Sequence, residues 1–119
     1  MSIQQTAVVG AGTMGNGIAH VLAMSGYKVI LIDLDADLLD EAVGTIASNL
    51  ERQVQKENIS AEDREAALRR ITKTTNTAEG VAAADLVVEA VSETQEVKAQ
   101  VFSEIDEHGP DSAILASNT

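Results

Sequence analysis

The sequence contains no cysteine, which excludes a disulfide framework, a thiolate metal site and a cysteine nucleophile. It contains two histidines, His20 and His108, which lie far apart along the chain and form no metal-ligand motif. We therefore expect no metal centre and no thiol chemistry.

Basic residues are also scarce, with 8 Lys and Arg against 19 Asp and Glu and a formal net charge of −11. Because no basic patch is large enough to displace the counterions of a nucleic acid, we expect no nucleic-acid partner. Solubility is a sufficient explanation of the acidity. No apolar run approaches the roughly 18 residues of a membrane span, and residues 1–5 carry no basic stretch. We expect neither secretion nor membrane insertion, and a cytoplasmic location.

The chain has 119 residues, of which 45% are hydrophobic and 23% charged, enough for one compact domain with its own core. We find no internal repeat, low-complexity tract or linker, so a single domain is predicted over residues 1–119.

Short apolar runs alternate with amphipathic stretches along the whole chain. The runs at 5–9, 27–32, 71–75, 85–91 and 112–117 predict strands. Five helices are predicted between these strands. The first ends at Gly26, the second begins after Asp35, and the third runs from Ser60 to about Arg70. The fourth has Thr77 as its cap, and the fifth ends at Gly109 and Pro110.

Alternating strands and helices with apolar strands predict a parallel sheet that is covered on both faces and has right-handed crossovers. The expected fold class is α/β, a doubly wound parallel sheet of the Rossmann type with three α/β/α layers and strand order 3-2-1-4-5.

The segment VVGAGTMGNGIAHVLAMSG, residues 8–26, places Gly10, Gly12 and Gly15 in a G-x-G-x-x-G motif between the first predicted strand and the first predicted helix. Gly10 permits the tight turn, Gly12 lets a pyrophosphate approach the backbone, and Gly15 lets the helix pack closely. We interpret Gly17, inside the helix, as a close-packing residue. Predicted cofactor contacts in this segment are Gly10, Ala11, Gly12, Thr13, Met14 and Gly15.

Free amides and the partial positive charge at the start of that helix can bind a diphosphate without a lysine. Asp33 ends the second predicted strand, where a carboxylate accepts hydrogen bonds from the adenine ribose hydroxyls and repels a 2′-phosphate. The predicted cofactor is therefore NAD rather than NADP. Met14 and His20 are interpreted as helix-face or solvated residues rather than catalysts.

Three blocks, GAGTMGNGIAHVLAMSGYKVILID, ADLVVEAVSETQEVKAQVFSEID and AILASNT, resemble successive signatures of the NAD-binding domain of L-3-hydroxyacyl-CoA dehydrogenases. The resemblance covers essentially the whole chain. The first block fits many dehydrogenases, whereas the E-x-x-x-x-K-x-x-x-F spacing and the S-N-T ending are more specific.

The resemblance implies reversible oxidation of an L-3-hydroxyacyl-CoA to the 3-ketoacyl-CoA, with hydride passing to NAD. It matches Ser117 to the family's active-site serine, which hydrogen-bonds the reacting oxygen of the substrate. Asn118 is placed near the nicotinamide end.

Further positions follow from the same resemblance. Glu93 and Lys98 match residues that line the cofactor, and Ala90 and Val91 would form the apolar wall there. From the sequence alone, Glu93 and Lys98 are equally an ordinary solvated pair at a helix start. Lys56 loosely matches a region that meets the CoA part of the substrate.

The family also uses a histidine general base, held by a glutamate, and a helical domain that closes on the substrate and forms a homodimer. None of these follows the serine motif in this sequence, and a base must lie within hydrogen-bond reach of the hydroxyl proton. We therefore expect the 119 residues alone to bind NAD with little or no turnover.

Two alternatives stay open from the sequence. One is a stand-alone NAD-binding or redox-sensing module that acts through a partner contact. The other is a related dehydrogenase of a free 3-hydroxyacid or a sugar acid.

Overall fold

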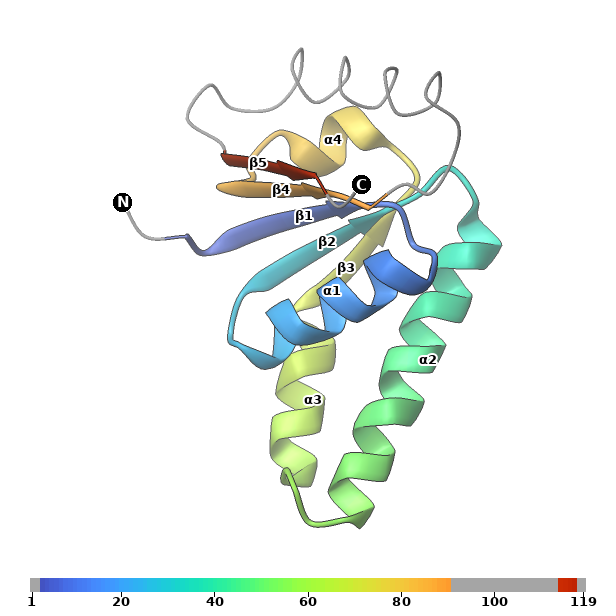
Figure 1. Ribbon diagram of the computed structural model, residues 1–119, viewed down its shortest axis with the longest axis vertical. Coiled ribbons are helices and arrows are strands. Elements are labelled where there is room, and N and C mark those ends of the chain that lie inside the picture. The colour runs from blue at the N-terminus through green and yellow to red at the C-terminus, as the bar shows by residue number, and fades with distance from the viewer. Residues whose placement is uncertain (1–2, 91–113, 118–119) are drawn as a thin grey trace.

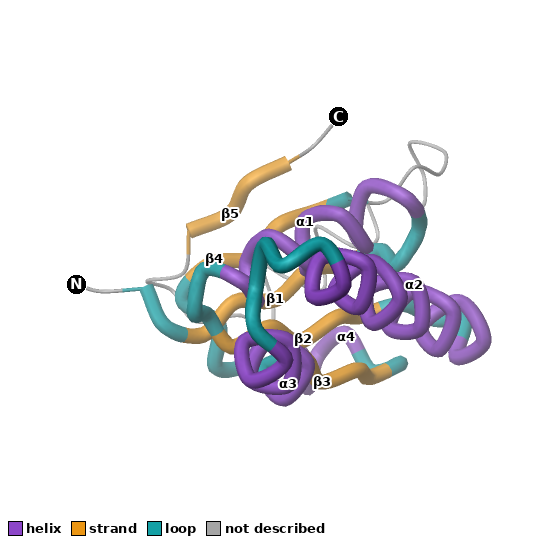
Figure 2. The backbone as a smooth tube through the Cα atoms, turned by 90° about the horizontal axis from the view of Figure 1, so that it is seen from below, coloured by secondary structure: helices purple, strands orange, loops and turns teal. Residues whose placement is uncertain are grey.

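The computed structural model describes residues 3–90 and 114–117, which include a five-stranded parallel sheet in the order β3-β2-β1-β4-β5 (Figure 1). This order and the α/β class confirm the prediction from sequence. Figure 2 shows β3 and β5 at opposite edges of the sheet. The strands are β1 (Gln5–Val9), β2 (Lys28–Ile32), β3 (Ile71–Thr74), β4 (Leu86–Glu89) and β5 (Ile114–Ser117).

Helices cover both faces of the sheet in the described ranges. One buried cluster, which includes Ala19, Ile46 and Ala67, joins α1, α2 and α3 to one face. A second cluster joins Val81 and Ala84 to the other face, where Figure 1 shows α4. The helices are α1 (Thr13–Met24), α2 (Ala36–Gln55), α3 (Ala61–Arg69) and α4 (Thr77–Val81).

Side-chain caps fix the starts of three helices. The Asp35 carboxylate accepts hydrogen bonds from the backbone N–H groups of Asp37 and Leu38, and Ser60 forms a capping box with Asp63. Both caps confirm the sequence prediction. The prediction that Thr77 caps α4 is wrong, because Asn76 is the cap and accepts a hydrogen bond from the Glu79 N–H at 3.0 Å. The predicted helix ending at Gly109 lies outside the described residues.

Asp85 connects the amino ends of β1 and β4. Its carboxylate accepts hydrogen bonds from the backbone N–H groups of Gln4 and Gln5, each at 3.0 Å. These two bonds, with the Gln5 bond the larger influence, hold the pKa of the Asp85 carboxyl below its usual value. The sequence predicts a strand that begins at Asp85, whereas β4 begins one residue later, at Leu86.

The carboxyl ends of the five strands lie in one row. Register pairs Ile32 with both Thr74 and Val9, and Glu89 with both Val9 and Ser117. Because the last residues of all these strands are level, the loops that follow them emerge at one edge of the sheet, where doubly wound folds bind ligands.

Candidate cofactor site

The turn from β1 to α1 is tight and is attached to β2. Gly10 has φ +109°, a conformation that favours glycine, and its N–H donates to the Ile32 carbonyl at 2.7 Å. The first glycine of the motif therefore has the role predicted from sequence, that of making the turn.

Gly15 brings the first turn of α1 against that loop. A Cβ atom at Gly15 would lie 1.6 Å from the Gly10 carbonyl oxygen and 3.6 Å from Cγ1 of Val8. Since no side chain fits at 1.6 Å from a backbone oxygen, only glycine permits this approach. The close packing predicted for Gly15 is confirmed, and its nearest contact is the glycine turn itself.

Gly12 leaves open space at the start of α1. No described atom lies within 4 Å of the position that a Gly12 Cβ would take. Gly12 is the N-cap of α1 and supplies no side-chain hydrogen bond, and the first turn contains no acidic residue. The amides of this turn are thus without a side-chain cap, unlike those of α2 and α3, which is the arrangement that binds a phosphate anion.

Asp33 joins the glycine turn to the start of α2. Its Oδ2 accepts a hydrogen bond from the Ala11 N–H at 2.9 Å, and its Oδ1 accepts one from the Asp35 N–H at 3.0 Å. Each carboxylate oxygen retains a further lone pair, so the half-buried Asp33 can still accept hydrogen bonds from two ribose hydroxyls. The groups predicted for the pyrophosphate and for the ribose are therefore adjacent.

Other predicted contacts lie around this turn. Thr13 and Met14 are exposed in the first turn of α1, with Met14 52% exposed. Ala90 is buried directly after β4, and its N–H donates to the Val9 carbonyl at 2.8 Å. The structure thus places Ala90 beside the end of β1, one residue from the glycine turn.

Lys56 lies away from these residues. It caps the carboxyl end of α2, whereas Asp35 caps the amino end, and a helix of 20 residues spans about 30 Å. Figure 1 shows this end of α2 far from the carboxyl ends of the strands. Lys56 and the glycine turn lie on different elements, at the end of α2 and between β1 and α1. A role for Lys56 in binding CoA stays a prediction.

Four predicted site residues, Val91, Glu93, Lys98 and Asn118, lie outside the described residues. The backbone of Ser117 ends β5, in register with Glu89. The active-site role of Ser117 also stays a prediction, although the backbone lies at the edge where that role requires it.

Two residues depart from the sequence interpretation. Gly17 is exposed, and no described atom lies within 4 Å of a Cβ placed there, so close packing is the wrong explanation for it. Glu89 has 0% exposure at the end of β4, whereas the sequence pattern predicts it only as part of an apolar strand. The available signal was a carboxylate in the otherwise apolar stretch LVVEAV.

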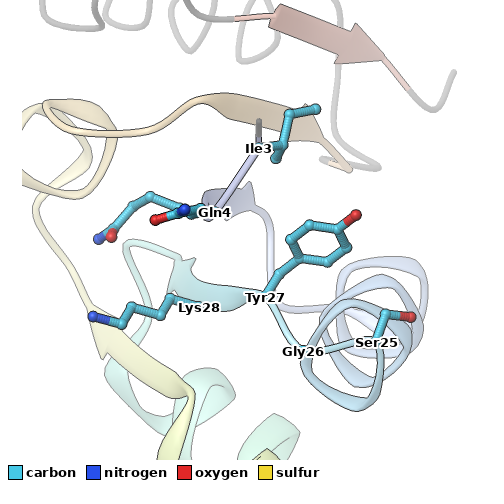
Figure 3. Close-up of a pocket in the computed structure, with 7 residues that line it drawn as sticks. Ile3, Gln4, Ser25, Gly26, Tyr27 and Lys28 are labelled. Atoms are coloured by element: carbon cyan, nitrogen blue, oxygen red, sulfur yellow. The ribbon is translucent and has the colours of Figure 1, made fainter. Parts of the chain in front are cut away.

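A pocket of about 440 Å³ lies at the amino ends of the strands, on the side of the sheet away from the glycine turn (Figure 3). Its lining comes from the amino ends of β1 and β2 and from the end of α1, including Gln4, Tyr27 and Lys28. It is therefore separate from the glycine turn. In the parts of the chain with described positions, no helix is long and apolar enough to cross a membrane, and no cluster of His, Asp and Glu could hold a metal ion.

A family model described as "3-hydroxyacyl-CoA dehydrogenase, NAD binding domain" matches residues 5–119. A 3-hydroxybutyryl-CoA dehydrogenase of Bradyrhizobium diazoefficiens is 43% identical over 117 residues, and a 3-hydroxyadipyl-CoA dehydrogenase of Escherichia coli is 40% identical over 119. The crystal structure of an (S)-3-hydroxybutyryl-CoA dehydrogenase of Ralstonia eutropha superposes with a TM-score of 0.93 at 38% identity.

These relatives are much longer than the chain. The alignments cover 98%, 100% and 99% of this chain, but only 40%, 25% and 41% of the three relatives in the same order. The similarity therefore concerns one part of each relative.

Proposed function

Because the chain belongs to the 3-hydroxyacyl-CoA dehydrogenase family, as its NAD-binding domain, we propose that it holds the cofactor for the interconversion of an L-3-hydroxyacyl-CoA and a 3-ketoacyl-CoA. The observation that carries the proposal is the hydrogen bond from the Ala11 N–H to Asp33, which fixes the glycine turn against the acidic end of β2.

The residues around the turn fit the two phosphates and the adenine ribose of NAD. The open space at Gly12 and the uncapped amides of α1 would receive the pyrophosphate. Asp33 would accept hydrogen bonds from both ribose hydroxyls and would repel a phosphate at the 2′ position. This division of tasks selects NAD without any basic side chain.

The nicotinamide would lie toward the ends of β4 and β5. When bound, NAD accepts or donates the hydride that interconverts the alcohol and the ketone. Ala90 and Val91 would provide an apolar wall, and Glu93, Lys98 and Asn118 would line the same end. Ser117 would donate a hydrogen bond to the reacting oxygen and so position the substrate and stabilise charge that develops on it.

The acyl-CoA substrate is supported by the names of the relatives, which act on 3-hydroxybutyryl-CoA and 3-hydroxyadipyl-CoA. We extend the proposal to Lys56 as a contact of the CoA part, to a cytoplasmic location, and to a homodimer formed through a helical domain of the complete enzyme. The acyl group itself is left open, because the two relatives differ in it.

A fluorescence titration of NADH and NADPH into the chain tests the cofactor site, since the absence of tryptophan leaves little protein background. We expect NADH to bind at least about tenfold more tightly than NADPH, a difference of about 1.4 kcal/mol. Asp33→Ser should reduce this preference. Asp37→Ser is the matched control, because Asp37 is exposed in the first turn of α2 and should leave the preference intact. Equal binding of both nucleotides by the wild-type chain would contradict the role of Asp33.

A further inference from the structure

Glu89 is the one carboxylate that is fully buried among the residues described, with 0% exposure. A buried carboxylate costs far more free energy than a buried valine unless hydrogen-bond donors surround it. The structure gives Glu89 an interaction partner, and no buried side-chain oxygen or nitrogen in the described ranges lacks a hydrogen bond. The carboxylate is therefore held in place by its partner. Because an apolar residue would fill the same space at a lower cost in free energy, the presence of a carboxylate here calls for an explanation.

On the described strands, Glu89 has an apolar neighbour in register on one flank and a serine on the other. Glu89 alternates with Val88 along β4 and so faces the same side as Val87, in the cluster that contains Val9 and Val81. Its neighbour in register on β1 is Val9, which offers no side-chain donor. On the opposite flank the neighbour in register is Ser117, at the carboxyl end of β5.

β5 lies at one edge of the described sheet. It is an edge strand of four residues, and β4 is its only neighbour among the described strands. Short edge strands open locally with little cost in free energy. A fixed acceptor at the end of β4 would therefore matter most at the last residue of β5.

We propose that Glu89 is a positioning residue for the nicotinamide half of the cofactor site, whose buried carboxylate holds the carboxyl end of β5 at Ser117. The proposal rests on the proposed function, because it assumes that NAD lies across the carboxyl edge of the sheet. In the proposed site, Gly12 and Asp33 hold the adenine half from the turns that follow β1 and β2. Glu89 fixes the other half from β4.

Because the proposed site has an adenine half and a nicotinamide half, ligands that fill one or both halves distinguish a positioning role of Glu89 from a merely structural one. NADH and ADP-ribose share the adenosine and both phosphates, but only NADH carries the nicotinamide. In Glu89→Gln we expect the affinity for NADH to fall by about tenfold, with the affinity for ADP-ribose unchanged. Glu79→Gln is the matched control, because Glu79 is exposed on α4 and loses the same charge. Equal losses for both ligands, or no loss for either, would overturn the proposal.

Amide hydrogen exchange then locates the effect. Glu89→Gln should speed exchange in a peptide that contains residues 114–117 and leave exchange in β2 unchanged. Unchanged exchange at 114–117 would overturn the proposal. If Glu89→Gln does not fold, Glu89→Asp keeps a carboxylate but shortens its reach, and it should show the same selective loss of NADH to a smaller extent. Absence of any NADH binding by the wild-type chain would overturn the proposed cofactor site, and the role of Glu89 with it.

Discussion

At the scale of single residues, we assign different constraints to three glycines of one segment, although only Gly15 has described atoms close to the position of a Cβ. A side chain at Gly15 would collide with the Gly10 carbonyl, one at Gly12 would enter the space that we assign to a pyrophosphate, and one at Gly17 would meet no described atom. The first constraint belongs to the folded protein, and the second only to its complex with the cofactor. The third position carries no steric constraint.

Alanine at Gly12 and at Gly15 should therefore separate folding from binding. We expect Gly12→Ala to leave the melting temperature nearly unchanged and to weaken NADH binding, because its Cβ occupies the approach to the α1 amides. Gly15→Ala should lower both stability and binding, because the turn must shift to admit its Cβ. Thermal melts and NADH titrations of the two variants check this. A Gly15→Ala variant as stable as the wild type would contradict it.

Gly17→Ala should stabilise the chain. Gly17 lies in the interior of α1, is exposed, and costs roughly 1 kcal/mol relative to alanine in a helix. We expect a gain of up to about 1 kcal/mol in the free energy of unfolding, with unchanged NADH affinity. Urea denaturation measures the gain. A loss of NADH affinity would assign Gly17 to the cofactor site.

The sequence predicts these residues unevenly. G-x-G-x-x-G between a strand and a helix predicts the turn at Gly10 and the close approach at Gly15, since both depend on local backbone geometry. It does not reveal that Gly17 faces solvent or that Glu89 is completely buried. The exposure of one position in a helix or strand depends on the elements that pack against it, which the local pattern does not contain.

At the scale of elements, the starts of β1 and β4 are joined by the carboxylate of one residue. Asp85 receives two backbone N–H groups from residues about 80 positions away in the sequence, and these bonds lower its pKa. A carboxyl whose pKa is lower in the folded state adds stability above its unfolded pKa of about 3.9, and this contribution is lost as the pH falls through the folded pKa.

Asp85→Asn should consequently reduce stability at pH 7, because hydrogen bonds to a charged acceptor are stronger than those to an amide oxygen. The difference from the wild type should shrink as the pH is lowered below about 4. Urea midpoints of both proteins between pH 7 and pH 3 measure it, and Asp37→Asn, at an exposed carboxylate in α2, serves as control. A difference that does not vary with pH would contradict this account.

Helix starts illustrate how far local patterns determine elements. Asp35 and the pair Ser60 and Asp63 cap as the sequence predicts. Before α4 we predict Thr77 as the cap from the sequence, although Asn76 is the residue that precedes Glu79 by three positions, the spacing of a capping box. The structure uses Asn76, and Thr77 becomes a buried residue of the first turn.

At the scale of the whole molecule, the alternation of elements predicts a parallel sheet, and the strand order predicted for a doubly wound fold agrees with the structure. Distances between elements cannot be predicted in this way. Lys56 follows the amphipathic stretch that forms α2. The sequence predicts the length of this helix but not the direction in which it runs from the sheet. Only the packed structure shows that α2 runs away from the carboxyl ends of the strands and so carries Lys56 away from them (Figure 1).

Cofactor binding should stabilise the whole molecule. A ligand at 100 times its dissociation constant adds about 2.7 kcal/mol to the free energy of unfolding, which for a chain of this size raises the melting temperature by about 10 °C. We expect this shift with NADH and a smaller one with NADPH at the same concentration. Scanning calorimetry measures both. Equal shifts would indicate binding that does not involve Asp33.

The central place of β1 has a consequence for the order of folding. Of the five described strands, β1 is synthesised before the others and β2 follows after α1. The other neighbour of β1 is β4, which begins only at Leu86. During synthesis one edge of β1 stays unpaired until the ribosome has added some eighty further residues, and an unpaired edge can pair with the wrong strand. Substitutions in β4 should therefore reduce the yield of soluble protein in cells more than their effect on equilibrium stability accounts for, because they prolong the time for which the nascent chain has an open edge.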